Sequence, residues 1–334
     1  MNTKTLTRRD FLLLAAVAAT GCGRAAEGTA AEGTAGPGPR TAPGSGGPAP
    51  GLAVPGAGLP PGTPWRAGAG EIKPEVKELA SRLVETAGSW SAGANDTAAL
   101  RTRLSAAGFP PALAGSTGAL LSEAPAARTQ VTYPQYGGLG SGRASVMVTA
   151  EQTLVAAAGP ARRGFTVDVR LVETGVGWAV QEALPGIPGP EALPLDAAAT
   201  AVLRDRRIAL PAAAAGDIRA GVVDPQVLAM LTALAAEHEL AVAVLVSGHP
   251  RNVFGTDRVS KHTLGRAVDI WRIDGHPLAD PATPPELVSA VMRHAAALGA
   301  VEIGGPVDLD GGPGGAYFTD DVHHDHVHFG VRGS

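Results

Sequence analysis

The sequence of 334 residues contains a single cysteine and few aromatic residues, and its lysines lie only at positions 4, 73, 77 and 261. One cysteine excludes an intramolecular disulfide, so a folded domain must be stable without one. Aromatic residues make up 4% of the chain. We therefore expect cores built largely from Ala, Val and Leu.

An excess of basic charge is also absent. The formal net charge is −4, and no basic stripe with interleaved aromatic residues occurs in the sequence. These features argue against a nucleic-acid partner. The apolar run from Phe11 to Ala19 is too short for a transmembrane helix, which takes about 20 apolar residues.

The N-terminus has the features of a targeting segment. Thr7-Arg8-Arg9-Asp10-Phe11-Leu12 resembles a twin-arginine export signal, and Ala19-Thr20-Gly21-Cys22 resembles a bacterial lipobox. The pattern predicts a signal peptide over 1–21 and lipidation of Cys22, which would anchor the exported protein to the cell membrane, facing the cell wall. The alternative is an ordinary cleaved signal with an incidental cysteine.

Residues 22–70 are rich in Gly, Ala, Pro and Thr, with almost no large apolar side chains. Such a segment buries too little surface to offset the entropy of ordering, so the composition predicts a disordered linker.

Residues 71–188 are expected to form a small α+β domain. Helical spacing of apolar residues predicts helices over Lys73–Ala87 and Thr97–Ala106. Apolar alternation then predicts strands over Ala144–Thr149, Gln152–Ala157, Gly164–Glu173 and Gly177–Ala183. This order of elements resembles nuclear-transport-factor and cystatin-like domains. We expect the domain to serve as a spacer, a binding unit or a folding support.

The proline-rich stretch from Leu184 to Pro194 marks a domain boundary, and 195–334 is expected to form a second domain. Asp224 and Pro225 have the residue types of a helix N-cap and first position. Ala241–Val246 reads as a buried strand, and Pro285–Leu298 as an amphipathic helix.

Two stretches of this second domain contain groups that bind metals. The first runs from Ser260 to Asp269 and includes His262; the second is Asp325-His326-Val327-His328. Two histidines and one carboxylate are a usual ligand set for catalytic zinc, which keeps its fourth position open. Ala267–Ile273 reads as a strand, and alternation around Val327 predicts a second strand with both histidines on one face. Either stretch alone would also be consistent with histidines on a strand that bind no metal.

The motif Ser-x-His-x-x-Gly-x-Ala-x-Asp, followed by His-x-His, resembles the signature of zinc peptidases related to D-alanyl-D-alanine carboxypeptidases. That group shares a core fold with lysostaphin-type enzymes and the hedgehog signalling domain. The resemblance covers roughly residues 200–334. It implies an α+β domain with a central antiparallel sheet and flanking helices, and Zn²⁺ bound by His262, Asp269 and His328.

The resemblance also implies catalytic residues. Family members place a general base either three residues before the last ligand or at the first His of His-x-His. Here these positions are Asp325 and His326, and the choice between them stays open. An arginine after a Ser-Gly pair commonly polarises the substrate carbonyl; Arg251 occupies a slightly later position. His323 and His324 are expected to be solvent-exposed rather than close to the metal.

The leading hypothesis is a zinc-dependent peptidase that hydrolyses stem peptides of cell-wall peptidoglycan, at a D,D-, L,D- or other bond. The first alternative is a zinc-containing envelope module that binds without hydrolysis. The second is a structural lipoprotein that holds no metal. The oligomeric state is left open.

Overall fold

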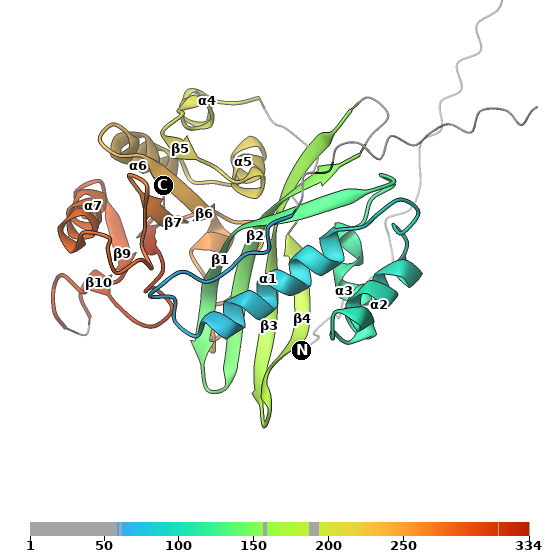
Figure 1. Cartoon of the computed structure of the whole chain (residues 1–334). Helices are drawn as coiled ribbons and strands as arrows, with labels where there is room; N and C mark the ends of the chain where they lie inside the picture. The colour runs from blue at the N-terminus through green and yellow to red at the C-terminus, as the bar shows by residue number, and fades with distance from the viewer. Residues whose placement is uncertain (1–58, 60–61, 156–158, 187–193, 313, 334) are drawn as a thin grey trace, which may run out of the picture. The chain divides into compact units, whose positions relative to one another are not determined.

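The computed structural model describes residues 59, 62–155, 159–186, 194–312 and 314–333. These residues belong to one compact unit, which has an α+β fold with two β-sheets (Figure 1). The predicted signal peptide at 1–21, Cys22 and most of the predicted linker lie outside the described residues.

The first sheet is an antiparallel meander whose strands follow chain order: β1 (Ala127–Gly140), β2 (Arg143–Leu154), β3 (Ala161–Thr174) and β4 (Gly177–Gly186). One face packs against α1 (Pro74–Gly88), α2 (Thr97–Ala106) and α3 (Ala114–Thr117), with the short 3-10 turns η1 (Pro111–Leu113) and η2 (Gly118–Leu120). On β3, the apolar residues Phe165, Val167 and Val169 join this core, because alternate side chains share a face.

The first sheet and its helices, within residues 62–155 and 159–186, form the first half of the described molecule. For this half, the sequence predictions are correct for the helices and incomplete for the strands. α2 has the predicted bounds, and α1 begins and ends one residue later than expected. The strands predicted over Ala144–Thr149 and Gln152–Ala157 are joined in one strand, β2, which ends at Leu154; residues 156–157 lie outside the described residues. β1 was missed because Pro134 and two register shifts interrupt its pattern. An edge strand tolerates such a proline, since its outer N–H groups need no ladder partner.

The predicted linker also ends earlier than expected. Thr63 N donates to Gln130 Oε1 (3.3 Å), and Trp65 N donates to Glu85 Oε1 (3.0 Å). The Trp65 side chain packs against the core of the first sheet. Residues 62–70 therefore belong to the folded unit, because this tryptophan supplies the apolar surface that the rest of the segment lacks.

The second sheet has the order β10–β9–β11–β7–β6–β5, and β8 pairs with β7. Its four middle strands are antiparallel, whereas the β10–β9 and β5–β6 pairs are parallel. The bounds are β5 (Ile208–Ala209), β6 (Leu240–Val244), β7 (Ala267–Ile273), β8 (His276–Pro277), β9 (Ala300–Gly304), β10 (Tyr317–Phe318) and β11 (Val327–Val331).

Helices supply the core that covers this second sheet: α4 (Ala197–Arg204), α5 (Ala212–Arg219), α6 (Pro225–Ala235) and α7 (Pro285–Ala297). The predicted start of α6 is confirmed: the Asp224 side chain accepts a hydrogen bond from Gln226 N (2.9 Å), with Pro225 as the first helical residue. The predicted strand at 241–246 corresponds to β6, which ends at Val244.

The two sheets contact each other directly. Met147 of β2 packs against Ala243 and Val244 of β6. Tyr133 of β1 stacks on Trp271 of β7, with ring centroids 4.4 Å apart and planes 8° from parallel. Segments far apart in the sequence are therefore brought together along this contact.

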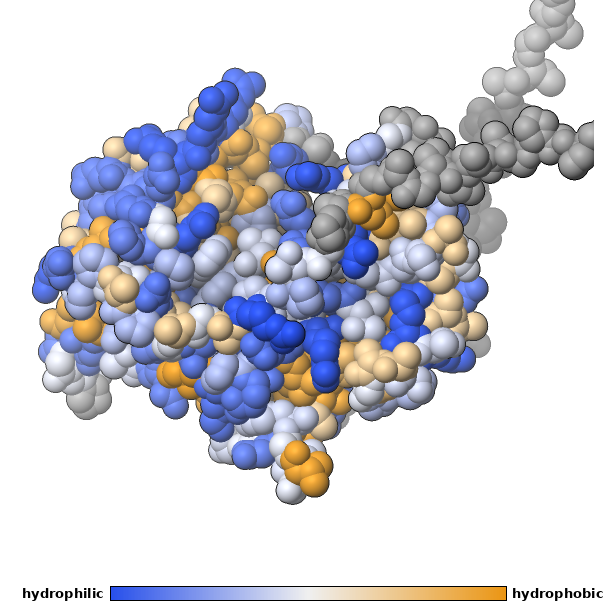
Figure 2. Space-filling model, in the orientation of Figure 1, coloured by the Kyte–Doolittle hydropathy of each residue, from blue (hydrophilic) through white to orange (hydrophobic). Residues whose placement is uncertain are grey.

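Hydrophilic residues cover most of the described surface in the view of Figure 2, and hydrophobic ones lie in several separate groups. Among the described residues, no helix has the length and apolar character needed to cross a membrane.

Candidate metal centre

The sheet register places the C-terminal histidine beside the carboxylate. In the antiparallel β11–β7 pair, His328 lies directly opposite Asp269. His262 begins the 3-10 turn η3 (His262–Leu264), which ends at Gly265 with φ of 70°. A left-handed residue at this position turns the chain back into β7. The imidazole of His262 therefore returns to Asp269, seven residues later.

The three side chains predicted as ligands converge on a small volume. His262 Nε2 lies 3.0 Å from Asp269 Oδ1 and 3.1 Å from His328 Nδ1. His328 Nδ1 lies 2.9 Å from Asp269 Oδ1. Zinc bonds of about 2.0–2.2 Å in tetrahedral geometry separate ligand atoms by about 3.3 Å. The three atoms are thus close to the spacing that one ion requires.

The hydrogen bonds around His262 also suit a cation. Its Nδ1 lies 2.6 Å from the carbonyl oxygen of Leu245 and must donate to it, because a carbonyl only accepts. Nε2 of the neutral ring then carries a lone pair that faces the Asp269 carboxylate. Two electron-rich atoms 3.0 Å apart repel each other unless a proton or a metal ion lies between them. The donor set therefore fits a metal ion.

His249 is a further candidate ligand that the sequence analysis did not identify. His249, His262 and Asp269 could hold a metal ion, because their ligand atoms lie within 4.8 Å of one another. His249 Nδ1 donates to the carbonyl oxygen of Pro250 (2.7 Å), which leaves Nε2 as a lone-pair atom. Burial and the neighbouring His262 lower the pKa of His249 to about 3, so its ring is neutral at pH 7.

Burial alone would favour the neutral forms of His328 and Asp269 as well. It lowers the pKa of His328 to about 4. For Asp269, burial raises the pKa, but the neighbouring imidazoles of His262, His326 and His328 lower it by more. The pKa of Asp269 lies well below its usual value, so this carboxylate stays ionised. A neutral imidazole and an ionised carboxylate are the forms that bind metals.

Asp325 and His326 form a carboxylate–imidazole pair beside the three predicted ligands. His326 Nδ1 donates to Asp325 Oδ1 (2.6 Å), and His326 Nε2 lies 3.8 Å from Asp269 Oδ2. Burial lowers the pKa of His326, but the charge of Asp269 and the hydrogen bond to Asp325 raise it overall. The imidazole of His326 faces the cluster, whereas the other oxygen of Asp325 pairs with Lys77 of α1.

A cavity of about 780 Å³ opens onto these groups. It is lined by residues of both sheets and of the connecting loops, including Tyr136, Phe254, Arg258, Glu302 and His323. Arg258 pairs with Glu302 (3.3 Å), and His328 Nε2 lies 3.8 Å from that carboxylate. A substrate in this cavity would contact the candidate metal ligands, His326 and one cation.

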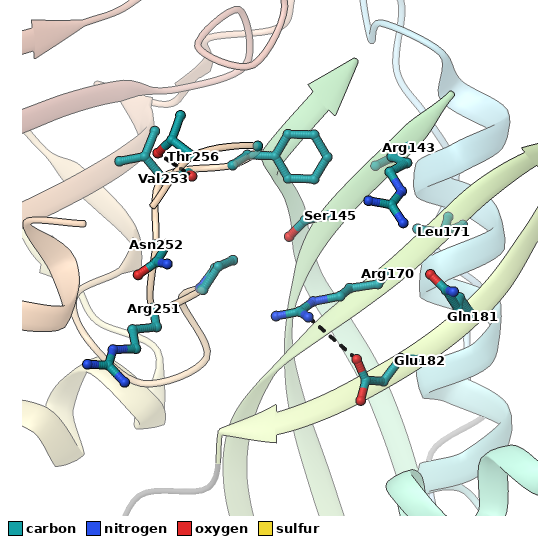
Figure 3. A pocket seen from close by; sticks show the side chains of 14 residues that line it. Arg143, Ser145, Arg170, Leu171, Gln181, Glu182, Arg251, Asn252, Val253 and Thr256 are labelled. Atoms are coloured by element: carbon teal, nitrogen blue, oxygen red, sulfur yellow. Dashed lines mark hydrogen bonds and ion pairs between the residues drawn. The ribbon is translucent and has the colours of Figure 1, made fainter. Parts of the chain in front are cut away.

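Two expectations about neighbouring residues need correction. Arg251 is exposed and lines a different cavity of about 680 Å³, together with Arg143, Arg170 and Glu182 of the first sheet (Figure 3). It is absent from the lining of the cavity at His262.

His323 was expected to be solvent-exposed, yet it lies at the site. It lines the 780 Å³ cavity, and its ring centroid is 5.1 Å from that of His326. Its Nδ1 contacts Asp320 (2.7 Å). His324 contacts the carbonyl oxygen of Gly70 (3.1 Å) and is absent from the lining of this cavity.

Comparison with known proteins assigns no family. No protein-family model matches the chain, and no curated protein matches it. One solved structure, described as an Ntf2 like protein involved in plasmid conjugation, matches 36% of this chain and 51% of that chain, with 15% identity and a TM-score of 0.26. The chain thus spans about half the length of that protein.

Proposed function

We propose that the protein is a zinc-dependent peptidase that hydrolyses stem peptides of cell-wall peptidoglycan. The convergence of His262, Asp269 and His328, with ligand atoms 2.9–3.1 Å apart, is the observation that carries the metal site. The peptide substrate follows from the resemblance of the motif to D-alanyl-D-alanine carboxypeptidase-like peptidases. The cavity of about 780 Å³ is large enough for a short peptide segment.

The remaining catalytic roles are assigned to side chains of the protein. A zinc ion with three protein ligands keeps an open position and supplies a Lewis acid for water and for a carbonyl oxygen. His326 accepts the proton of the attacking water at Nε2, because Nδ1 is already committed to Asp325. The geometry therefore favours His326 over Asp325 as the base, with Asp325 fixing the tautomer and orientation of the ring.

Arg258 is the better candidate for the cation that steadies the developing negative charge on the carbonyl oxygen. It lines the cavity that His262 and His328 also line, whereas Arg251 lines a separate one. A cation aimed at developing charge stabilises the transition state more than the ground state.

The direct test is digestion of purified muropeptides by protein loaded with about one zinc ion per chain. Mass spectrometry of the products identifies the bond that is cleaved. We expect chelation and the His262→Ala variant to abolish cleavage. Intact muropeptides after prolonged incubation with fully loaded protein would contradict the proposal.

His249 favours a second function, that of a non-catalytic zinc-containing binding module. If His249 joins His262, Asp269 and His328, the ion has four protein ligands and no open position. Closed four-ligand sites are typical of structural zinc. The loaded protein would then bind envelope components through its cavity without hydrolysing them.

A further inference from the structure

A lysine of the first half of the molecule is completely enclosed beside the candidate active site. Lys77 lies in the first turn of α1 and has 0% exposure. Its Nζ donates to Glu71 Oε2, to Asp325 Oδ2 and to the Tyr133 hydroxyl (3.3 Å). An ammonium has three N–H donors, and here each has a partner. An unpaired buried charge is strongly unfavourable, so this complete pairing makes the buried lysine tolerable.

Lys77 binds the carboxylate oxygen of Asp325 that His326 does not contact. Oδ1 of Asp325 accepts from His326 Nδ1 (2.6 Å), while Oδ2 accepts from Lys77 and from the backbone N–H of Tyr136 (3.3 Å). Rotation of the carboxylate would break all three contacts. Lys77 therefore fixes Asp325, and Asp325 fixes the imidazole of His326.

A second contact from the same half reaches the metal ligands. Gln135 of β1 is buried, and its Nε2 donates to Asp269 Oδ2 (2.6 Å). This bond occupies one carboxylate oxygen and orients the other, Oδ1, toward His262 and His328. Partners of this kind around metal ligands typically change metal affinity by about 10–100-fold.

We propose that α1 and β1 of the first half are built into the active site, with Lys77 positioning the Asp325–His326 pair and Gln135 positioning Asp269. This gives the small α+β half a specific role beyond spacing or folding support. The role of Lys77 in turnover rests on the proposed peptidase function. The role of Gln135 in metal binding does not.

Replacement of Lys77 tests the first part. In the full-length, zinc-loaded protein, Lys77→Met is expected to lower kcat by about 10–100-fold, with zinc stoichiometry retained and KM little changed, because a mispositioned base affects the chemical step. Lys77→Arg keeps the charge and should recover part of the loss. The NMR signal of the His326 Nδ1 proton should move in Lys77→Met, since Asp325 loses its fixed orientation.

Asp168→Asn is the matched control for general destabilisation. Asp168 is also a buried carboxylate of the first sheet, and its hydrogen bonds go to Ser145 (2.6 Å) and Arg170 (3.1 Å) rather than to the Asp325–His326 pair. It should lower stability while kcat and the His326 signal stay unchanged. Full kcat and an unmoved signal in folded Lys77→Met protein would overturn the role of Lys77. If that variant does not fold, Lys77→Gln takes its place, and full kcat there has the same meaning.

Gln135→Leu tests the second part through the zinc dissociation constant, measured by competition with a chelator. We expect binding about 10–100-fold weaker than in the wild type. Gln130→Leu is the control, because Gln130 lies on the same strand, is exposed and bonds to Thr63. If the wild type binds zinc but cleaves no peptide, the peptidase proposal fails, and the zinc dissociation constant of Gln135→Leu still tests the role of Gln135. An unchanged dissociation constant in Gln135→Leu overturns the inference.

Discussion

His249 lies face to face with His262, with ring centroids 4.2 Å apart and planes 12° from parallel. The turn that brings the two rings together passes through Gly248, whose φ of 84° is accessible to glycine without strain. Because His262 is shared by both candidate ligand sets, the position of His249 decides whether the site has three protein ligands or four.

His249→Ala should separate these two cases. If the site is open and catalytic, the variant keeps its zinc, and peptide cleavage falls only modestly. If His249 is a fourth ligand, its removal weakens zinc binding strongly and creates an open position. We expect the first outcome, and chelator competition on the purified variant measures it. A loss of zinc as large as that in Asp269→Ala would instead support the closed site.

His328→Ala should abolish stoichiometric zinc binding, because two ligands hold the ion far less tightly than three. His276→Ala is the control, since His276 lies exposed on β8. Metal analysis after gel filtration should give about one zinc per chain in the control and far less in His328→Ala. Full occupancy in His328→Ala would show that His328 is not a ligand.

His326→Ala and Asp325→Ala should both retain zinc. His326→Ala should lower kcat by about 10²–10⁴-fold, the usual contribution of a positioned proton acceptor. Asp325→Ala should lower kcat clearly less, since the imidazole remains and loses only its orientation. Steady-state kinetics on one muropeptide substrate compares the two. The reverse order would assign the base to Asp325, and less than tenfold loss in both would remove the hydrolytic mechanism.

Gly265→Ala should destabilise the fold more than Gly311→Ala does. Both glycines are left-handed, with φ of 70° and 68°, and an alanine there costs about 1–2 kcal/mol. A Cβ at Gly265 would lie 1.9 Å from the carbonyl oxygen of Val222, whereas nothing lies within 4 Å at Gly311. We expect a further loss of about 1–3 kcal/mol at Gly265 from this overlap. Denaturant titrations of the two variants measure the difference; equal losses would contradict it.

Cys22→Ser should convert an anchored protein into a released one. One acyl chain anchors a protein only marginally, whereas the two or more chains of a bacterial lipoprotein cysteine hold it stably. Fractionation of cells and medium, with mass spectrometry of the N-terminal peptide, checks the result. Wild-type protein found entirely in the medium, without lipid mass, would remove the anchor hypothesis.

The candidate site residues that could be proposed from the sequence lie close together in the chain or on regular strands. His262 and Asp269 are only seven positions apart, so the turn and strand that carry them could be inferred from local patterns. His328 could be assigned to the same strand face as His326, because side chains two residues apart on a strand point to the same side. The start of α6 at Asp224 was also predictable, because helix capping depends on residues that are adjacent in the sequence.

The contacts of Lys77 and Gln135 were not predictable in this way. Gln135 lies on β1, where Pro134 and two register shifts disrupt the alternation that identifies a strand. Lys77 occupies the first turn of a helix, a position that ordinarily faces solvent for a charged residue. Each reaches its partner only through the packing of one sheet on the other, and periodicity carries no information about that packing.

The pairing of Lys77 with Asp325 joins positions 248 residues apart in the chain. At synthesis rates of about 5–20 residues per second, α1 leaves the ribosome about 12–50 s before its partner exists. During that interval the first sheet can form, but its buried lysine lacks one of its two carboxylates. The contact also raises the contact order of the fold, and such long-range closure is slow. Activity should therefore arise only after β11, which carries His328, has been added.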